Sequence, residues 1–166
     1  MYPIYQRSRK RSIRNMGWME DVFVERLAVN RGVGALWNEM RDSVGQALME
    51  YGQRTLNLAV VPAFRSTDCQ ARGRFCIRVV KHPDAAWLEI FLDQANRVLK
   101  TAQEGGVEKD VCQYRLGDQG LQFYTESEEA GVTPISIESA CRKALEKFML
   151  DPFPAQFRDG QNIAVV

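Results

Sequence analysis

The sequence predicts a single α+β domain in which one antiparallel sheet of about six strands lies between two helices. Three observations support this class. Apolar residues recur at helical spacing from Trp18 to about residue 53, several short alternating segments follow, and a second helical stripe closes the pattern at Leu150. Because strands joined by short turns must run antiparallel, we expect a meander with the helices packed against the sheet.

The first helix is expected to be long and either kinked or split. Its apolar positions recur at intervals of three, four or seven residues. Gly32 and Gly34 interrupt this stripe, and each glycine costs about 1 kcal/mol relative to alanine inside a helix. The more regular half covers about residues 35–53, and Gly52 suits a helix C-terminus.

Alternation and turn residues predict the strands. The expected segments are Thr55–Phe64, which Pro62 makes an edge strand or ends, then Phe75–Val80, Trp87–Leu92, Val98–Gln103, and a hairpin of Val111–Leu116 with Leu121–Thr125 around Gly117–Gly120. Ser66–Gly73 is expected to be a loop and Glu126–Thr133 a polar connector.

The second helix is expected to begin at Pro134, with Thr133 as its N-cap, and to bury one apolar face between Ile137 and Leu150. After Pro152 and Pro154 have ended the helix, residues 163–166 are expected to add a short edge strand.

Charge divides the chain into a basic, flexible N-terminal arm, residues 1–16, and a single α+β domain, residues 17–166. The arm carries five basic residues and no acid: Arg7, Arg9, Lys10, Arg11 and Arg14. Such a run repels itself and favours an extended chain that could attract nucleic acid or an acidic partner. A solvated tail, or translation that begins at Met16 or Met19, would also explain this run of basic residues. The formal net charge of +1 excludes a globally basic nucleic-acid binder.

Metal and cofactor motifs are absent from the sequence, so we expect neither group. The four cysteines form no C-x-x-C pair, and His82 is the one histidine. We expect free thiols, with Cys76, Cys112 and Cys141 in the core and Cys69 exposed and open to oxidation. Neither a membrane-spanning apolar run nor a secretory signal is found, which predicts a cytoplasmic protein that does not bind membranes.

Two polar groups are weak candidates for chemistry. His82 could act as an acid or base with Asp84 or with Cys69, although an exposed turn histidine explains the same residues. Glu126, Glu128 and Glu129 form an acidic cluster, which we interpret as a solvated loop near the N-terminus of the last helix because no calcium-loop pattern accompanies it.

The strand Trp87–Leu92 carries the leading functional hypothesis. It is apolar at five of six positions and therefore presents apolar side chains to both faces of the sheet. One helix on each face would cover both sides of the strand. If both helices cover the same face, the other face can bind an apolar ligand, a peptide or a second subunit, as in a homodimer. The expected contact residues are Trp87, Phe91, Phe123 and Tyr124. We therefore expect a non-catalytic binding or interaction module, with nucleic-acid or acidic-partner association through the arm as the alternative.

Overall fold

The computed structural model describes residues 2–57 and 62–150, with side chains from Gly17 onward. A 53-residue helix comes first and a 14-residue helix comes last. The elements in chain order are α1 (Tyr2–Arg54), β1 (Ala63–Asp68), β2 (Cys76–His82), β3 (Trp87–Asp93), β4 (Val98–Gln103), β5 (Lys109–Gly117), β6 (Gly120–Ser127), β7 (Gly131–Ile135) and α2 (Ile137–Leu150).

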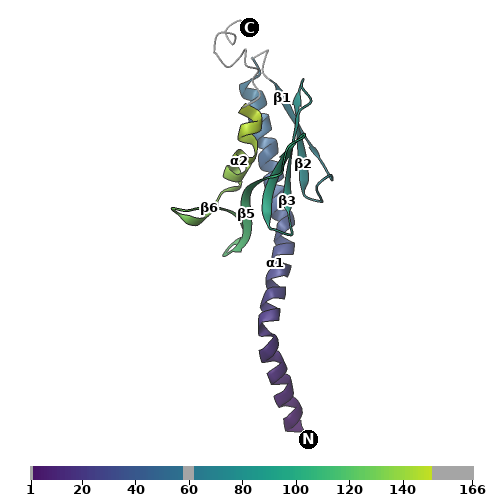
Figure 1. Cartoon of the computed structure of the whole chain (residues 1–166), viewed down its shortest axis with the longest axis vertical. Helices are drawn as coiled ribbons and strands as arrows, with labels where there is room; N and C mark the ends of the chain where they lie inside the picture. Colours follow the sequence, from purple (N-terminus) through teal and green to yellow (C-terminus); the bar gives the residue numbers. More distant parts are fainter. Residues whose placement is uncertain (1, 58–61, 151–166) are drawn as a thin grey trace.

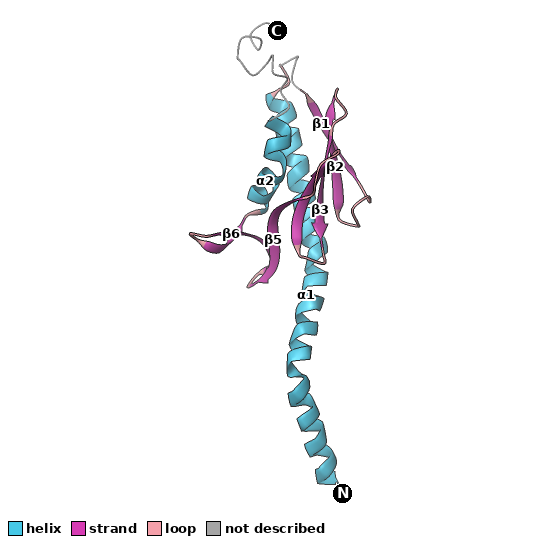
Figure 2. Ribbon diagram, viewed as in Figure 1, coloured by secondary structure: helices cyan, strands magenta, loops and turns pink. Residues whose placement is uncertain are grey.

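The strands form one sheet in sequence order, β1 to β7, and every neighbouring pair is antiparallel. Both helices lie on the same side of this sheet, with α2 alongside the C-terminal half of α1 (Figure 2). The predicted α+β meander with a long first helix and a packed last helix is confirmed, with seven strands where about six were expected.

The core lies between the helices and the inner face of the sheet. Alternation along β3 sends Leu88, Ile90 and Leu92 inward, and their side chains are almost fully buried. The helical stripe of α1 supplies the opposite wall through Val29, Val33, Leu36, Trp37, Met40 and Val44. The apolar face predicted for α2 packs beside it through Ala140, Cys141, Ala144, Leu145, Phe148 and Met149.

The two glycines do not split α1, which is one continuous helix. A Cβ at Gly32 would lie 3.1 Å from Leu121 Cγ, whereas a Cβ at Gly34 would meet nothing within 4 Å. Gly32 therefore lets α1 approach β6 closely. The apolar stripe of α1 is interrupted at Gly32 because a larger side chain there would collide with Leu121 of β6.

The N-terminal residues differ from the expected extended arm, because α1 already begins at Tyr2. Starting a helix is costly, whereas extending one that is already held by packing adds a hydrogen bond per residue. Arginine and lysine are also good helix formers. Figure 1 shows this end of α1 projecting well beyond the sheet.

Both ends of the sheet differ from the prediction. The chain from Thr55 to Asn57 forms turns, and β1 covers Ala63–Asp68, so it runs into the segment expected to be a loop. The end of β6 and the start of the edge strand β7 occupy the expected polar connector. Pro134 lies in β7 and does not open α2, and it is tolerated there because an edge strand has a side without a neighbour. Ser136 caps α2 in place of Thr133, since its Oγ accepts a hydrogen bond from the N–H of Ser139 at 3.0 Å.

The edge strand expected at residues 163–166 lies outside the described residues. Neither helix, over the part of the chain that the structure describes, contains an apolar segment long enough to cross a bilayer.

Replacing Gly32 with valine should lower the free energy of unfolding by about 1–3 kcal/mol, because the added methyl groups overpack against Leu121. Gly34→Val is the matched control and should change stability by only a few tenths of a kcal/mol, in the favourable direction. Urea unfolding of both variants measures this. Equal effects at the two positions would contradict the close approach of α1 to β6.

Candidate functional site

The outer face of the sheet, opposite the helices, carries a compact polar cluster on β2, β3 and the β1–β2 loop. Trp87, Glu89 and Phe91 point to this face because they alternate with the inward residues of β3. Arg78 lies opposite Glu89 on β2, and Cys76 lies opposite Phe91. The strand is therefore apolar on its inner side and mixed on its outer side.

The four expected contact residues do not share one face. Trp87 and Tyr124 are half-buried on the outer face, and Phe91 lies there but is 4% exposed. Phe123 points inward and is fully buried beneath the helices, so it has no surface to offer a partner.

Glu89 is the centre of the outer cluster and is only 2% exposed. Its Oε2 accepts a hydrogen bond from Arg72 Nε at 3.0 Å, and its Oε1 accepts one from Arg78 Nη2 at 2.7 Å. The hydrogen bond to Glu89 raises the pKa of Arg78. A buried carboxylate is costly without partners, and here both of its oxygens have a cationic donor.

The same two arginines cover the aromatic rings of β3. The guanidinium of Arg78 lies 4.7 Å from the centre of the Trp87 ring, and that of Arg72 lies 5.5 Å from the centre of the Phe91 ring. Both distances are in the range of cation–π contacts. The outer aromatic side chains are thus covered largely by the protein's own cations.

A second group of charges continues this network at the end of β3. Lys100 Nζ lies 3.2 Å from Asp93 Oδ2 and 3.6 Å from Glu108 Oε2, and Glu108 also binds Arg72. Hydrogen bonds from Asn96 and Lys100 lower the pKa of Asp93. A cleft of about 410 Å³ opens beside these residues, with Arg72, Phe91, Asp93 and Glu108 in its wall.

Two thiols border the buried carboxylate. The sulfur atoms of Cys69 and Cys76 and a carboxylate oxygen of Glu89 all lie within 4.8 Å of one another. Cys69 is half-buried and Cys76 is 2% exposed. Burial, followed by the hydrogen bond to Cys69, raises the pKa of Cys76 to about 12.

A metal ion fits these three groups poorly. Both oxygens of Glu89 already accept hydrogen bonds from arginine, and a cation there would face two guanidinium groups. Two thiolates and one carboxylate would also leave one position of a tetrahedral zinc site without a protein ligand.

His82 does not join this cluster. It is exposed at the end of β2, whereas Cys76 lies at the start of the same strand. Six residues of extended chain, roughly 20 Å, separate the two, and Cys69 lies beside Cys76 on the neighbouring chain segment. Asp84 pairs instead with Lys81 at 2.9 Å. The expected pairing of His82 with Cys69 or Asp84 is therefore not formed.

The acidic residues Glu126, Glu128 and Glu129 are exposed at the end of β6 and in the turn before β7. The five residues of β7 separate this turn from the start of α2. The cluster therefore does not lie at the helix N-terminus, as had been expected, because β7 takes the place of the connector.

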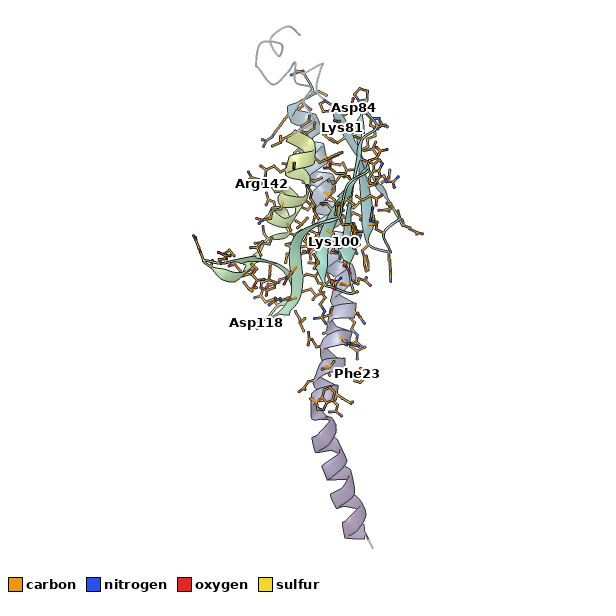
Figure 3. All side chains as sticks on the ribbon, in the orientation of Figure 1. Phe23, Lys81, Asp84, Lys100, Asp118 and Arg142 are labelled. Carbon is orange, nitrogen blue, oxygen red and sulfur yellow. The ribbon has the colours of Figure 1, made fainter. Side chains whose placement is uncertain are left out.

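A separate apolar surface lies on α1 where the helix leaves the sheet and projects beyond it. It consists of Trp18, Met19, Val22, Phe23 and Leu27, which we call the α1 stripe. Their exposed fractions run from 39% to 65%, and Figure 3 shows Phe23 on this projecting part. Val22 precedes buried Val29 by one heptad, so Trp18, Met19 and Val22 continue the side of α1 that packs against the sheet. Phe23 and Leu27 widen the stripe beyond that side.

Comparisons of the chain with protein-family models, with curated proteins and with solved structures find no match.

Replacing Glu89 with glutamine should lower the free energy of unfolding by about 1–3 kcal/mol, because two arginines lose the anion that compensates them. Glu108→Gln is the matched control, since Glu108 also binds Arg72 but is exposed, and it should cost at most about 0.5 kcal/mol. Chemical denaturation of both variants measures the difference. A Glu89→Gln protein as stable as Glu108→Gln would contradict the central role of Glu89.

Asp93 predicts a pH dependence of stability. Its pKa in the folded protein lies below the ordinary value of 3.8. The carboxylate therefore stabilises the fold at pH values above 3.8, and this contribution disappears as the pH falls through the folded-state pKa. The difference in unfolding free energy between the protein and its Asp93→Asn variant should be constant near neutrality and shrink below pH 3.8. A difference that persists at lower pH would contradict the assignment.

Proposed function

We propose that this protein is a non-catalytic interaction module that forms a homodimer by pairing the projecting part of α1 with the same part of a second copy. The α1 stripe is the observation that carries this proposal. Five large apolar side chains that the sheet leaves uncovered on one side of a helix are a pattern typical of a protein–protein contact.

The extent of the stripe supports a contact between two copies. Covering its exposed side chains on both copies would bury roughly 1,000 Å², which is near the lower limit for a specific interface. Trp18 and Phe23 supply much of this area, and aromatic residues of this kind often dominate binding energy.

The charge order along α1 favours an antiparallel arrangement. Its first part contains five basic residues between Arg7 and Arg14, and the acidic residues Glu20, Asp21 and Glu25 follow. Two parallel helices would align like charges along their length. Two antiparallel helices that overlap along the whole projecting part place the basic segment of each copy along the acidic residues and the α1 stripe of the other, which stabilises the pair.

The outer face of the sheet is a weaker candidate for partner binding. Phe91 is almost fully buried there, Trp87 lies under Arg78, and Glu89 neutralises charge within the cluster. The sheet therefore offers a partner less uncovered apolar surface than α1 does. For this reason we place the expected self-association on α1.

The substitution Phe23→Asp should raise the dissociation constant of the dimer by about 30-fold or more, because it removes an aromatic anchor and buries a charge. Val24→Asp is the matched control. Val24 is 66% exposed but lies outside the stripe, so the same charge there should leave the dissociation constant unchanged. Analytical ultracentrifugation over a range of concentrations measures both.

A monomeric protein at every concentration, or equal weakening by the two substitutions, would overturn the proposal. The same preparations should be titrated with duplex DNA and single-stranded RNA at low and physiological salt. Binding that falls steeply with salt, in a protein that stays monomeric, would instead support nucleic-acid association through the basic residues of α1.

A further inference from the structure

We infer that Cys69 and Cys76 form a reversible redox pair, in which a low-molecular-weight disulfide converts the two thiols into an intramolecular disulfide. This inference concerns the outer face of the sheet and does not depend on the proposed dimer. It rests on strand register, on the separation of the sulfur atoms and on the charges around them.

The register of the β1–β2 pair brings the two residues together. Asp68 lies opposite Ile77, so the next step places Cys69 opposite Cys76, and the N–H of Cys69 donates to the carbonyl of Cys76 at 3.1 Å. Directly paired residues of this type have Cα atoms about 5.5 Å apart, within the range of natural disulfides. The sulfur atoms already lie within 4.8 Å, so rotation of the two side chains brings them to bonding distance.

The surroundings give the two thiols different roles. Cys69 is half-buried, its sulfur accepts a hydrogen bond from the N–H of Ala71 at 3.4 Å, and the charge of Arg78 acts on both sulfur atoms. A partly exposed thiol that has a hydrogen-bond donor and a cation nearby is more reactive than a thiol buried in apolar surroundings. Cys76 is buried, so Cys69 is the thiol that an external disulfide reaches first.

Oxidation then takes two exchange steps. Cys69 loses its proton to solvent, and its thiolate attacks one sulfur of the external disulfide, which releases one thiolate and leaves a mixed disulfide on Cys69. Cys76 Sγ then attacks Cys69 Sγ, the bond between Cys69 and the small molecule breaks, and the proton of Cys76 passes to the departing second thiolate. Two electrons pass from the protein to the external disulfide, and the two protons end on the two small thiols.

The pair closes a short loop that carries part of the outer cluster. Residues 70–75 lie between the two cysteines, and Arg72 on this loop binds both Glu89 and Glu108. A disulfide between the two cysteines would leave both arginine contacts of Glu89 in place. A metal ion bound to the same sulfur atoms would compete with the arginines for the carboxylate.

The test uses the full chain, reduced, freed of metal with a chelator and equilibrated under native conditions with oxidised glutathione. Remaining thiols are then alkylated in denaturant, and the protein is digested with trypsin. Cleavage after Arg72 and Arg74 separates Cys69, on peptide 66–72, from Cys76, on peptide 75–78. We expect loss of two of the four alkylatable thiols, with these two peptides joined and separable by dithiothreitol, while Cys112 and Cys141 remain alkylated.

Cys69→Ser should abolish the joined peptides, and Cys141→Ser, a buried cysteine outside the pair, should retain them. Three outcomes of the wild-type experiment would overturn the inference without reliance on any variant. These are four alkylated thiols, glutathione that stays on Cys69 without closure, or a joined pair that includes Cys112 or Cys141. Stoichiometric binding of Zn²⁺ that protects both thiols from glutathione would also overturn it, in favour of a metal site.

Discussion

The inner face of the sheet depends on α1 for its cover. Val29, Met40 and Val44 are buried against strands that would otherwise expose a broad apolar surface, and α2 alone has too short an apolar face to replace them. Helical spacing makes this packing surface a straight stripe along α1. The sheet, however, ends before the helix does, so the same stripe continues beyond the domain without a cover. The core and the exposed α1 stripe are thus two parts of one feature.

The outer face follows a different physical rule. No helix covers it within the described residues, yet Cys76, Phe91 and Ala102 are nearly inaccessible to solvent. Arg72 lies over the ring of Phe91 and is held there by the buried carboxylate of Glu89, and Cys69 packs against the same group. A polar network of this kind excludes water without a second hydrophobic layer. It also creates the low-dielectric surroundings that keep Cys76 protonated beside Cys69.

Periodicity predicted the elements whose burial is one-sided and regular. The α2 face, the hairpin around residues 117–120 and the strands β2 to β4 appear close to their expected positions for this reason. It failed at β1 and β7, where most side chains are exposed on both sides and the alternation carries little signal. Alternation alone places the consecutive residues Phe123 and Tyr124 on opposite faces, but the packing of β6 was needed to show that Phe123 is the one that faces the helices. The signal for the outer cluster was present in Glu89, a charged residue in an otherwise apolar strand, but its arginine partners lie 11 and 17 residues away.

The class of fold, the antiparallel order of the strands and the helical stripe of α1 could be predicted from the amino-acid sequence, because they follow from local spacing and from the length of the connections. The packing of the sheet against α1 was needed to show which part of that stripe is buried, why Gly32 stands within it and how Cys69 meets Cys76 across two strands. Such features depend on distances between segments that are separate in the chain. The local periodicity of the sequence does not specify those distances, which are set when the strands pair and the helices pack.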